Sequence, residues 1–137
     1  MTELKQTITA PDAPTGRGPF PQAVRAGSLV FLSGQGPLDP VTNEPICGSF
    51  AEQVRQTFHN VGAILAAAGL DLGDIVKLTV YLSDLSRVQE FNELYVAHMA
   101  EPLPARTLVQ AGLRGIDVEM DVIAVHPGIA AWHRVAE

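Results

Sequence analysis

The chain is organised around residues 103–125, which read LPARTLVQAGLRGIDVEMDVIAV. Two runs rich in β-branched and aliphatic residues flank a short segment that contains Gly112 and Gly115. This pattern is typical of a β-hairpin with a loop slightly longer than two residues. Pro104 favours extended geometry in the residue before it, so we expect Arg106 to project from the start of a rigid strand. A planar guanidinium held in this way suits a carboxylate.

Bulk composition narrows the class of protein. The 137 residues fit one domain, and 47% apolar against 18% charged residues is an apolar-rich balance that favours self-association. The net charge of -6 opposes non-specific binding to nucleic acid. A single cysteine, Cys47, excludes an internal disulfide and suits a reducing compartment. The sequence shows no apolar run of membrane-spanning length and no signal-peptide pattern, so we expect a cytoplasmic protein without a membrane partner.

The chain before the organising stretch predicts two helices and several strands. Pro and Gly make residues 9–21 an irregular lead-in, residues 22–25 and 29–33 form a hairpin, and residues 39–45 are rich in turns. Ser49 and Glu52 form a capping box that begins a helix, and a left-handed cap at Gly69 ends it. Its buried stripe comprises Val54, Phe58, Val61, Leu65 and Ala68.

A strand and a second helix follow. Residues 75–82 alternate, with Lys77, Thr79 and Tyr81 on one face and Val76, Leu78, Val80 and Leu82 on the other. Ser86 and Gln89 predict a second capping box. The helix that it begins ends before Pro102 and buries Val88, Phe91, Leu94, Tyr95 and Met99. The order hairpin, helix, strand, helix, hairpin predicts a two-layer α+β domain, with both helices on one face of a mostly antiparallel sheet.

Two residues of the organising stretch carry charges with more than one interpretation. Arg106 either pairs with one of the chain's fifteen acids or clamps a substrate carboxylate. Glu119 is either a solvated strand acid or a functional carboxylate. Pairing the predicted hairpin sets Arg106 opposite roughly Ile123, about 10 Å or more from Glu119 along the strands. If both serve one pocket, the simplest geometry is therefore a site at a subunit boundary.

Other classes of site find no support in the sequence. The four histidines, His59, His98, His126 and His133, lack the spacing of a metal site. No serine or cysteine lies in a nucleophile-elbow motif. We therefore expect no metal and no cofactor, and mild chemistry that needs little more than a held substrate and a positioned water.

Four short motifs together resemble one family. Pro104-Ala105-Arg106 is followed at the right distance by Val118-Glu119-Met120, and Gly18-Pro19-Phe20 and Ser33-Gly34-Gln35 come before them. In this order they resemble the RidA family, the reactive intermediate deaminases also called YjgF-like, from about residue 19 to residue 125. The resemblance implies one RidA-like domain over residues 1–137, with a core at about 19–125 and a tail at 126–137. It also implies a chorismate-mutase-like fold in which three subunits close their sheets around a central barrel, with sites at the subunit interfaces.

The resemblance also implies an activity and a set of site residues. The activity is hydrolysis of reactive imine or enamine acids, of the 2-aminoacrylate type, to 2-keto acids and ammonia. By the resemblance, Arg106 holds the substrate carboxylate and Glu119 orients or activates water. Main-chain groups near Gly34 and Thr107 line the pocket, and the rings of Phe20 and Tyr95 form apolar walls.

Two positions depart from the family pattern and keep alternatives open. Phe20 stands where tyrosine is usual, and Leu108 stands where well-studied members often carry cysteine. Both changes make the pocket more apolar, which favours a bulkier substrate. The alternatives are a deaminase of a larger unsaturated amino acid of the aminomuconate type, and a non-catalytic trimer that binds carboxylate metabolites or partner proteins.

Overall fold

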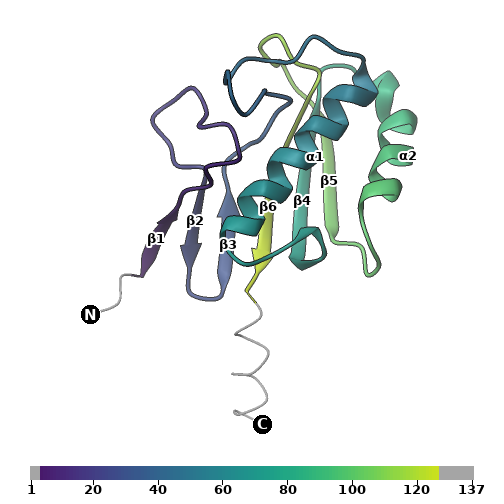
Figure 1. Cartoon of the computed structure of the whole chain (residues 1–137). Helices are drawn as coiled ribbons and strands as arrows, with labels where there is room; N and C mark the ends of the chain where they lie inside the picture. Colours follow the sequence, from purple (N-terminus) through teal and green to yellow (C-terminus); the bar gives the residue numbers. More distant parts are fainter. Residues whose placement is uncertain (1–3, 127–137) are drawn as a thin grey trace.

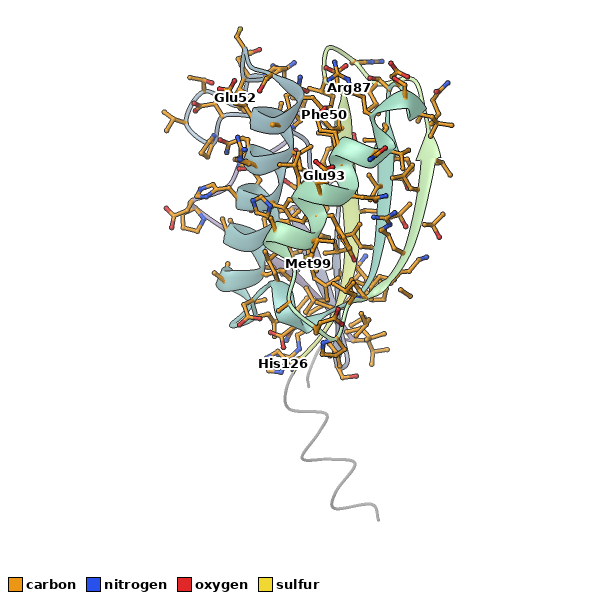
Figure 2. The ribbon with its side chains drawn as sticks, turned by 90° about the vertical axis from the view of Figure 1, so that its right-hand side faces the viewer. Phe50, Glu52, Arg87, Glu93, Met99 and His126 are labelled. Atoms are coloured by element: carbon orange, nitrogen blue, oxygen red, sulfur yellow. The ribbon has the colours of Figure 1, made fainter. Side chains whose placement is uncertain are left out.

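A computed structural model describes residues 4–126 as one six-stranded sheet with both long helices on the same face (Figure 1). The strand order is β1-β2-β3-β6-β4-β5. Figure 2 shows the two helices as one layer beside the edge-on sheet. The predicted two-layer α+β architecture is confirmed. The elements are β1 Lys5–Ile8, β2 Ala23–Ala26, β3 Leu29–Leu32, α1 Phe50–Ala67, β4 Ile75–Leu82, α2 Val88–His98, β5 Ala105–Gln110 and β6 Val118–Val125, with short 3₁₀ turns at Leu72–Asp74 and Leu85–Arg87.

The predicted hairpin at residues 103–125 is wrong. Both strands form, but β4 lies between them, parallel to β5 and antiparallel to β6. Leu78 of β4 is level with Arg106 on one side and with Val122 on the other. The segment from Ala111 to Asp117 instead crosses the end of β4, where Ala111 N donates to Leu82 O (3.0 Å) and Ser83 N to Asp117 O (3.1 Å).

Burial explains this order of strands. Alternate residues of β6 are buried, as are Leu78, Val80 and Leu82 of β4, so both strands occupy the centre beneath the helices. The more polar β5 is an edge strand. Because β4 and β5 are parallel, their connection requires a crossover, which α2 supplies. A local turn pattern carries no information on such a long-range arrangement.

The first helix forms as predicted, and the second begins differently. Ser49 Oγ accepts from Glu52 N (3.2 Å), and Glu52 Oε1 accepts from Ser49 N (3.1 Å), which completes the capping box of α1. The second capping box, at Ser86 and Gln89, is wrong. The carboxylate of Asp84 accepts from Ser86 N (2.9 Å) and starts a 3₁₀ turn, and α2 follows at Val88 without a side-chain cap.

Two further details differ from the sequence-based expectation. Val76 was assigned to the buried face of its strand, but 44% of it is exposed, because the register between β4 and β6 shifts between Ile75 and Lys77. Strand β1 was not predicted, and its mostly exposed residues pair with β2 at the edge of the sheet. Of the expected tail at 126–137, only His126 lies within the described residues; Trp132 and His133 lie outside them.

The face of the sheet opposite the helices carries both apolar and polar side chains. Phe31 is 38% exposed and Val109 40% exposed on this face. Lys77 Nζ donates to Thr107 Oγ1 (2.7 Å), and Tyr81 Oη donates to Asp121 Oδ2 (2.8 Å). No helix between residues 4 and 126 covers it, so this half-apolar face is available to a partner (Figure 2).

Candidate active site

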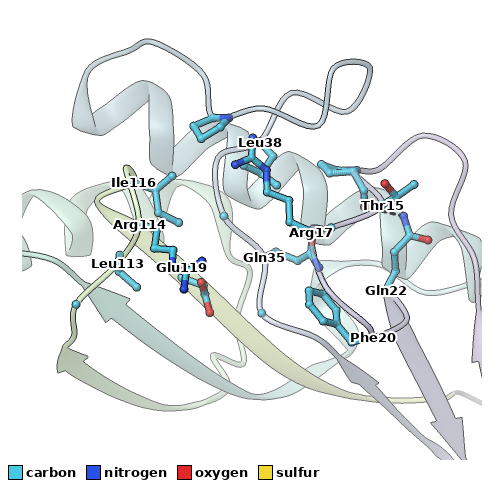
Figure 3. Close-up of a pocket in the computed structure, with 16 residues that line it drawn as sticks. Thr15, Arg17, Phe20, Gln22, Gln35, Leu38, Leu113, Arg114, Ile116 and Glu119 are labelled. Carbon is cyan, nitrogen blue, oxygen red and sulfur yellow. Dashed lines mark hydrogen bonds between the residues drawn. The ribbon is translucent and has the colours of Figure 1, made fainter.

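A pocket of about 330 Å³ lies where the irregular lead-in, the segment after β3 and the start of β6 meet (Figure 3). It contains three of the predicted site residues: Phe20, Gly34 and Glu119. Arg106, Thr107 and Tyr95 do not line it. Its lining comprises Pro14, Thr15, Gly16, Arg17, Phe20, Gln22, Gly34, Gln35, Gly36, Leu38, Pro45, Gly112, Leu113, Arg114, Ile116 and Glu119.

The lead-in that carries Phe20 is held by one buried side chain, Gln22. Gln22 Oε1 accepts from Ala10 N (2.6 Å), and its Nε2 donates to the carbonyls of Ala10, Ala13 and Pro14 at 2.8–3.2 Å. These bonds satisfy backbone groups that a segment without secondary structure would otherwise leave unpaired. The irregular segment is thereby a fixed wall of the pocket. Sequence reasoning missed Gln22, whose only signal is a polar residue directly before an apolar strand.

Gly34 lies directly against the Glu119 side chain. Gln35 N donates to Met120 O (2.7 Å) and Met120 N donates to Gln35 O (2.9 Å), so the segment after β3 is fixed to β6. A Cβ at Gly34 would collide with the Glu119 carboxylate and would lie 3.0 Å from its Cδ. Only glycine leaves this space open, and the backbone of Gly34 therefore forms a pocket wall beside the carboxylate.

A methyl group at Gly34 is therefore expected to displace Glu119. We expect Gly34→Ala to lower any activity of the pocket by roughly 10-fold or more, because a shift of about 1 Å in a reacting group has large effects. The overpacking should also lower the free energy of unfolding by about 1–3 kcal/mol. Kinetics and chemical denaturation measure the two effects.

Gly62→Ala is the matched control. A Cβ at this position of α1 would meet no atom of the described residues within 4 Å, apart from the adjacent backbone of its own helix. Alanine there should stabilise the helix by up to about 1 kcal/mol and leave turnover unchanged. Equal activity losses in both variants would contradict a specific role for the Gly34 backbone.

Glu119 is half-buried and electrostatically unusual. Burial raises the pKa of its carboxyl above the usual range, and the nearby charge of Asp121 raises it further. No donor between residues 4 and 126 bonds to its carboxylate, so its oxygens are free to bind water or substrate. A carboxyl with a raised pKa in a pocket is a typical general base.

Arg106 lies in a second group of residues, on the helix side of the sheet. Its Nη1 donates to Asn92 Oδ1 of α2 (2.8 Å). Its Cζ lies 4.9 Å from the centre of the Tyr95 ring and 5.7 Å from that of Phe91. Among residues 4–126 no carboxylate forms an ion pair with it. The amide and the rings orient the guanidinium while its other donors stay available.

Tyr95 and Asn92 complete this second group. Tyr95 packs beneath Arg106 in the core, and its buried Oη has no hydrogen-bond partner among residues 4–126. Asn92 was missed by sequence reasoning, because nothing in the order of residues marks an amide on α2 as the partner of an arginine fourteen positions later. Thr107 lies outside both groups, on the open face beside Lys77.

The sheet register keeps Arg106 and Glu119 apart within one chain. Arg106 is level with the buried Leu78 of β4, and Glu119 is level with Tyr81, three residues further along the same strand. Leu78 and Tyr81 face opposite sides of the sheet, so Arg106 and Glu119 do too. Their backbones are separated by about 10 Å along the strands and about 10 Å across two strand spacings. One chain therefore supplies two separate groups of candidate residues.

Among the described residues, no three His, Cys, Asp or Glu side chains form a group that could hold a metal ion. Over the same part of the chain, no helix has the length and apolar character needed to cross a membrane.

The fold and the motifs define a class of small α+β proteins with a pocket beside the sheet. The sequence model of the family described as Endoribonuclease L-PSP matches residues 10–126. The chain therefore belongs to this family, also known as the YjgF/RidA family, which confirms the resemblance seen in its motifs.

Individual relatives align over nearly their full length. A RutC family protein of Pyrococcus horikoshii is 39% identical over 89% of this chain and 97% of its own. A protein of Salmonella typhimurium named 2-iminobutanoate/2-iminopropanoate deaminase is also 39% identical, over 89% of this chain and 97% of its own. The solved structure of TdcF from E. coli with bound serine has a TM-score of 0.80 and 39% identity, covering 88% of this chain and 98% of that one.

Proposed function

We propose that the protein hydrolyses reactive imine and enamine acids of the 2-aminoacrylate type to 2-keto acids and ammonia. The observation that carries the proposal is the carboxylate of Glu119, which has no partner among residues 4–126 and lies beside the Gly34 backbone in the pocket. The deaminase name of the Salmonella relative and the amino acid bound to TdcF support a substrate with a carboxylate and a carbon–nitrogen bond. The chemistry needs no cofactor.

The proposed reaction uses one water per turnover. The enamine first takes a proton at its terminal carbon and becomes the imine. Glu119 accepts a proton from water as the oxygen attacks the carbon of the C=N bond. Glu119 passes this proton to the nitrogen, which gives an amino alcohol. The hydroxyl group then gives up its proton, the nitrogen gains one and leaves as ammonia, and the C=O bond of the keto acid forms. The raised pKa of Glu119 brings its basicity closer to neutral pH, where proton acceptance is most effective.

Arg106 is proposed to hold the substrate carboxylate from a neighbouring subunit. Within one chain Arg106 and Glu119 face opposite sides of the sheet, so a site that uses both needs two copies. The half-apolar open face of the sheet offers a surface on which copies can associate. We propose a homotrimer with three sites, each with Arg106 and Tyr95 from one subunit and Phe20, Gly34 and Glu119 from the next. The main chain at Thr107 lies one residue from Arg106 and would line the same site.

We expect the purified protein to have three times the mass of the single chain. Light scattering coupled to size exclusion measures this mass directly. A monomer at assay concentrations would overturn the boundary site, because no single chain brings the two groups together. Mixing inactive Arg106→Ala with inactive Glu119→Ala chains after unfolding should restore partial activity, since some boundaries then carry both intact groups.

The assay for the proposed function generates the substrate in place. A serine or threonine dehydratase releases the enamine in the presence of a competing imine trap, and keto-acid release is followed with and without the protein. Faster release with the wild type supports the deaminase. Binding of keto acids without faster release would instead favour the non-catalytic metabolite-binding trimer. The net charge of -6 argues against RNA as the substrate, whatever the family's description.

A further inference from the structure

We propose that the pocket selects imino acids whose side chain ends in a second acidic group, and that Arg114 binds that group. The proposal rests on the proposed function, because it names the substrate class of the same site. It begins from the charges that line the pocket. These are two arginines, Arg17 and Arg114, and one acid, Glu119 (Figure 3).

The two arginines differ in what they already contact. Arg17 Nε donates to Asn43 O (3.1 Å), and its guanidinium forms an ion pair with Glu44. Its charge is therefore already balanced within the chain. Arg114 is exposed, and no carboxylate or carbonyl between residues 4 and 126 bonds to it. An unpaired arginine beside a pocket is a ready binding group for a carboxylate.

The segment that carries Arg114 is fixed at both ends. Ala111 N donates to Leu82 O at one end. At the other, the side chain of Gln53 on α1 accepts from Asp117 N (2.9 Å) and donates to Asp117 Oδ2 (2.9 Å). Glu119 follows two residues later on β6. The backbone therefore holds Arg114 at a set position relative to Glu119, as a specificity residue requires.

The space beside Glu119 suits a longer substrate than a three-carbon imine. The pocket volume of about 330 Å³ falls in the range of sites that bury drug-sized ligands. Its walls include the apolar side chains of Phe20, Leu38, Leu113 and Ile116. An imino acid with a few methylene groups would contact these walls and present its terminal group to Arg114. The substrate that matches this pocket therefore has an apolar spacer between its reacting carbon and a terminal carboxylate.

The test compares two substrates that differ only in this terminal charge. An amino-acid oxidase converts glutamate and glutamine to their 2-imino acids, and release of the keto acids is measured against semicarbazide as the competing trap. We expect the wild type to prefer the acidic imine. The preference, as a ratio of kcat/KM values, should fall by about 10-fold in Arg114→Ala and further in Arg114→Glu, and Arg114→Lys should retain part of it. Arg55→Ala, which removes an exposed arginine of α1 away from this pocket, is the matched control.

The outcomes separate this proposal from the proposed function. Turnover of both imines with a ratio that Arg114→Ala leaves unchanged would overturn the role of Arg114 alone. If neither imine is turned over, the dehydratase-coupled assay decides the proposed function, and calorimetry with glutarate and its monoamide tests the pocket. Tighter binding of glutarate that weakens in Arg114→Ala would uphold the selectivity, and equal binding of the two ligands would overturn it.

Discussion

Replacing Arg106 by alanine is expected to lower kcat/KM for keto-acid release by about 100-fold or more. A guanidinium that holds a carboxylate through two charge-assisted hydrogen bonds contributes roughly 1.5–3 kcal/mol through each, and every 1.4 kcal/mol is a factor of ten. The dehydratase-coupled assay with an imine trap measures the loss. It should affect every substrate of the site, because all of them share the carboxylate next to the reacting carbon.

Packing must be separated from binding in this experiment. Arg106 lies over the rings of Tyr95 and Phe91, so alanine also removes stabilising contacts. Arg106→Lys keeps the charge and most of the stem but loses the planar fork, and we expect it to remain more than about 10-fold impaired with a smaller loss in Tm. Arg55→Ala controls for the loss of a surface charge. Wild-type kcat/KM in Arg106→Ala would remove the carboxylate clamp from the mechanism.

Replacing Glu119 by glutamine is expected to lower kcat by about 10²–10⁴-fold and to raise the stability of the fold at pH 7. The loss of rate follows from removing the general base. The gain in stability follows from the raised pKa of Glu119, since burial and Asp121 disfavour its charged form. A carboxylate that serves activity at a cost to stability is a common example of the trade-off between activity and stability.

The sign of the pH dependence follows from the same shift. The folded-state pKa of Glu119 lies above its unfolded value, so the fold favours the protonated form. The stability that the protonated Glu119 carboxyl contributes is fully present at pH values below its pKa in the unfolded chain. It is lost as the pH rises through its pKa in the folded protein. Glutamine is neutral throughout, so the gain in Tm over wild type should appear at pH 7 and shrink towards pH 4.

A second variant tests whether the charge of Asp121 contributes to the raised pKa of Glu119. Asp121→Asn retains an acceptor for the Tyr81 hydroxyl but removes the charge that raises the pKa of Glu119. The acid limb of the pH–rate profile should therefore move to lower pH. A Glu119→Gln variant that retains wild-type turnover would contradict the role of Glu119 as general base. A variant that is less stable than wild type at pH 7 would contradict the raised pKa of its carboxyl.

Local chemistry in the sequence was sufficient to place most elements. The capping box at Ser49 and Glu52 defines the start of α1, because both partners lie within one turn. The alternation in residues 118–125 identifies a strand with one buried face. The motifs also marked Phe20, Gly34 and Glu119 as site candidates, and the structure brings these three together around one pocket. Each of these inferences depends on near neighbours or on short motifs.

Only the tertiary structure decided how distant segments meet. The glycines between residues 110 and 118 are compatible with a hairpin, yet β4 takes the place between β5 and β6, because two apolar strands gain most by lying together beneath the helices. The support of the lead-in by Gln22 and the orientation of Arg106 by Asn92 also join residues that no local pattern connects. The sequence by itself determined most of the elements, the family and the chemical inventory. Strand order and the separation of Arg106 from Glu119 follow from long-range burial and pairing, which form only when the whole chain packs.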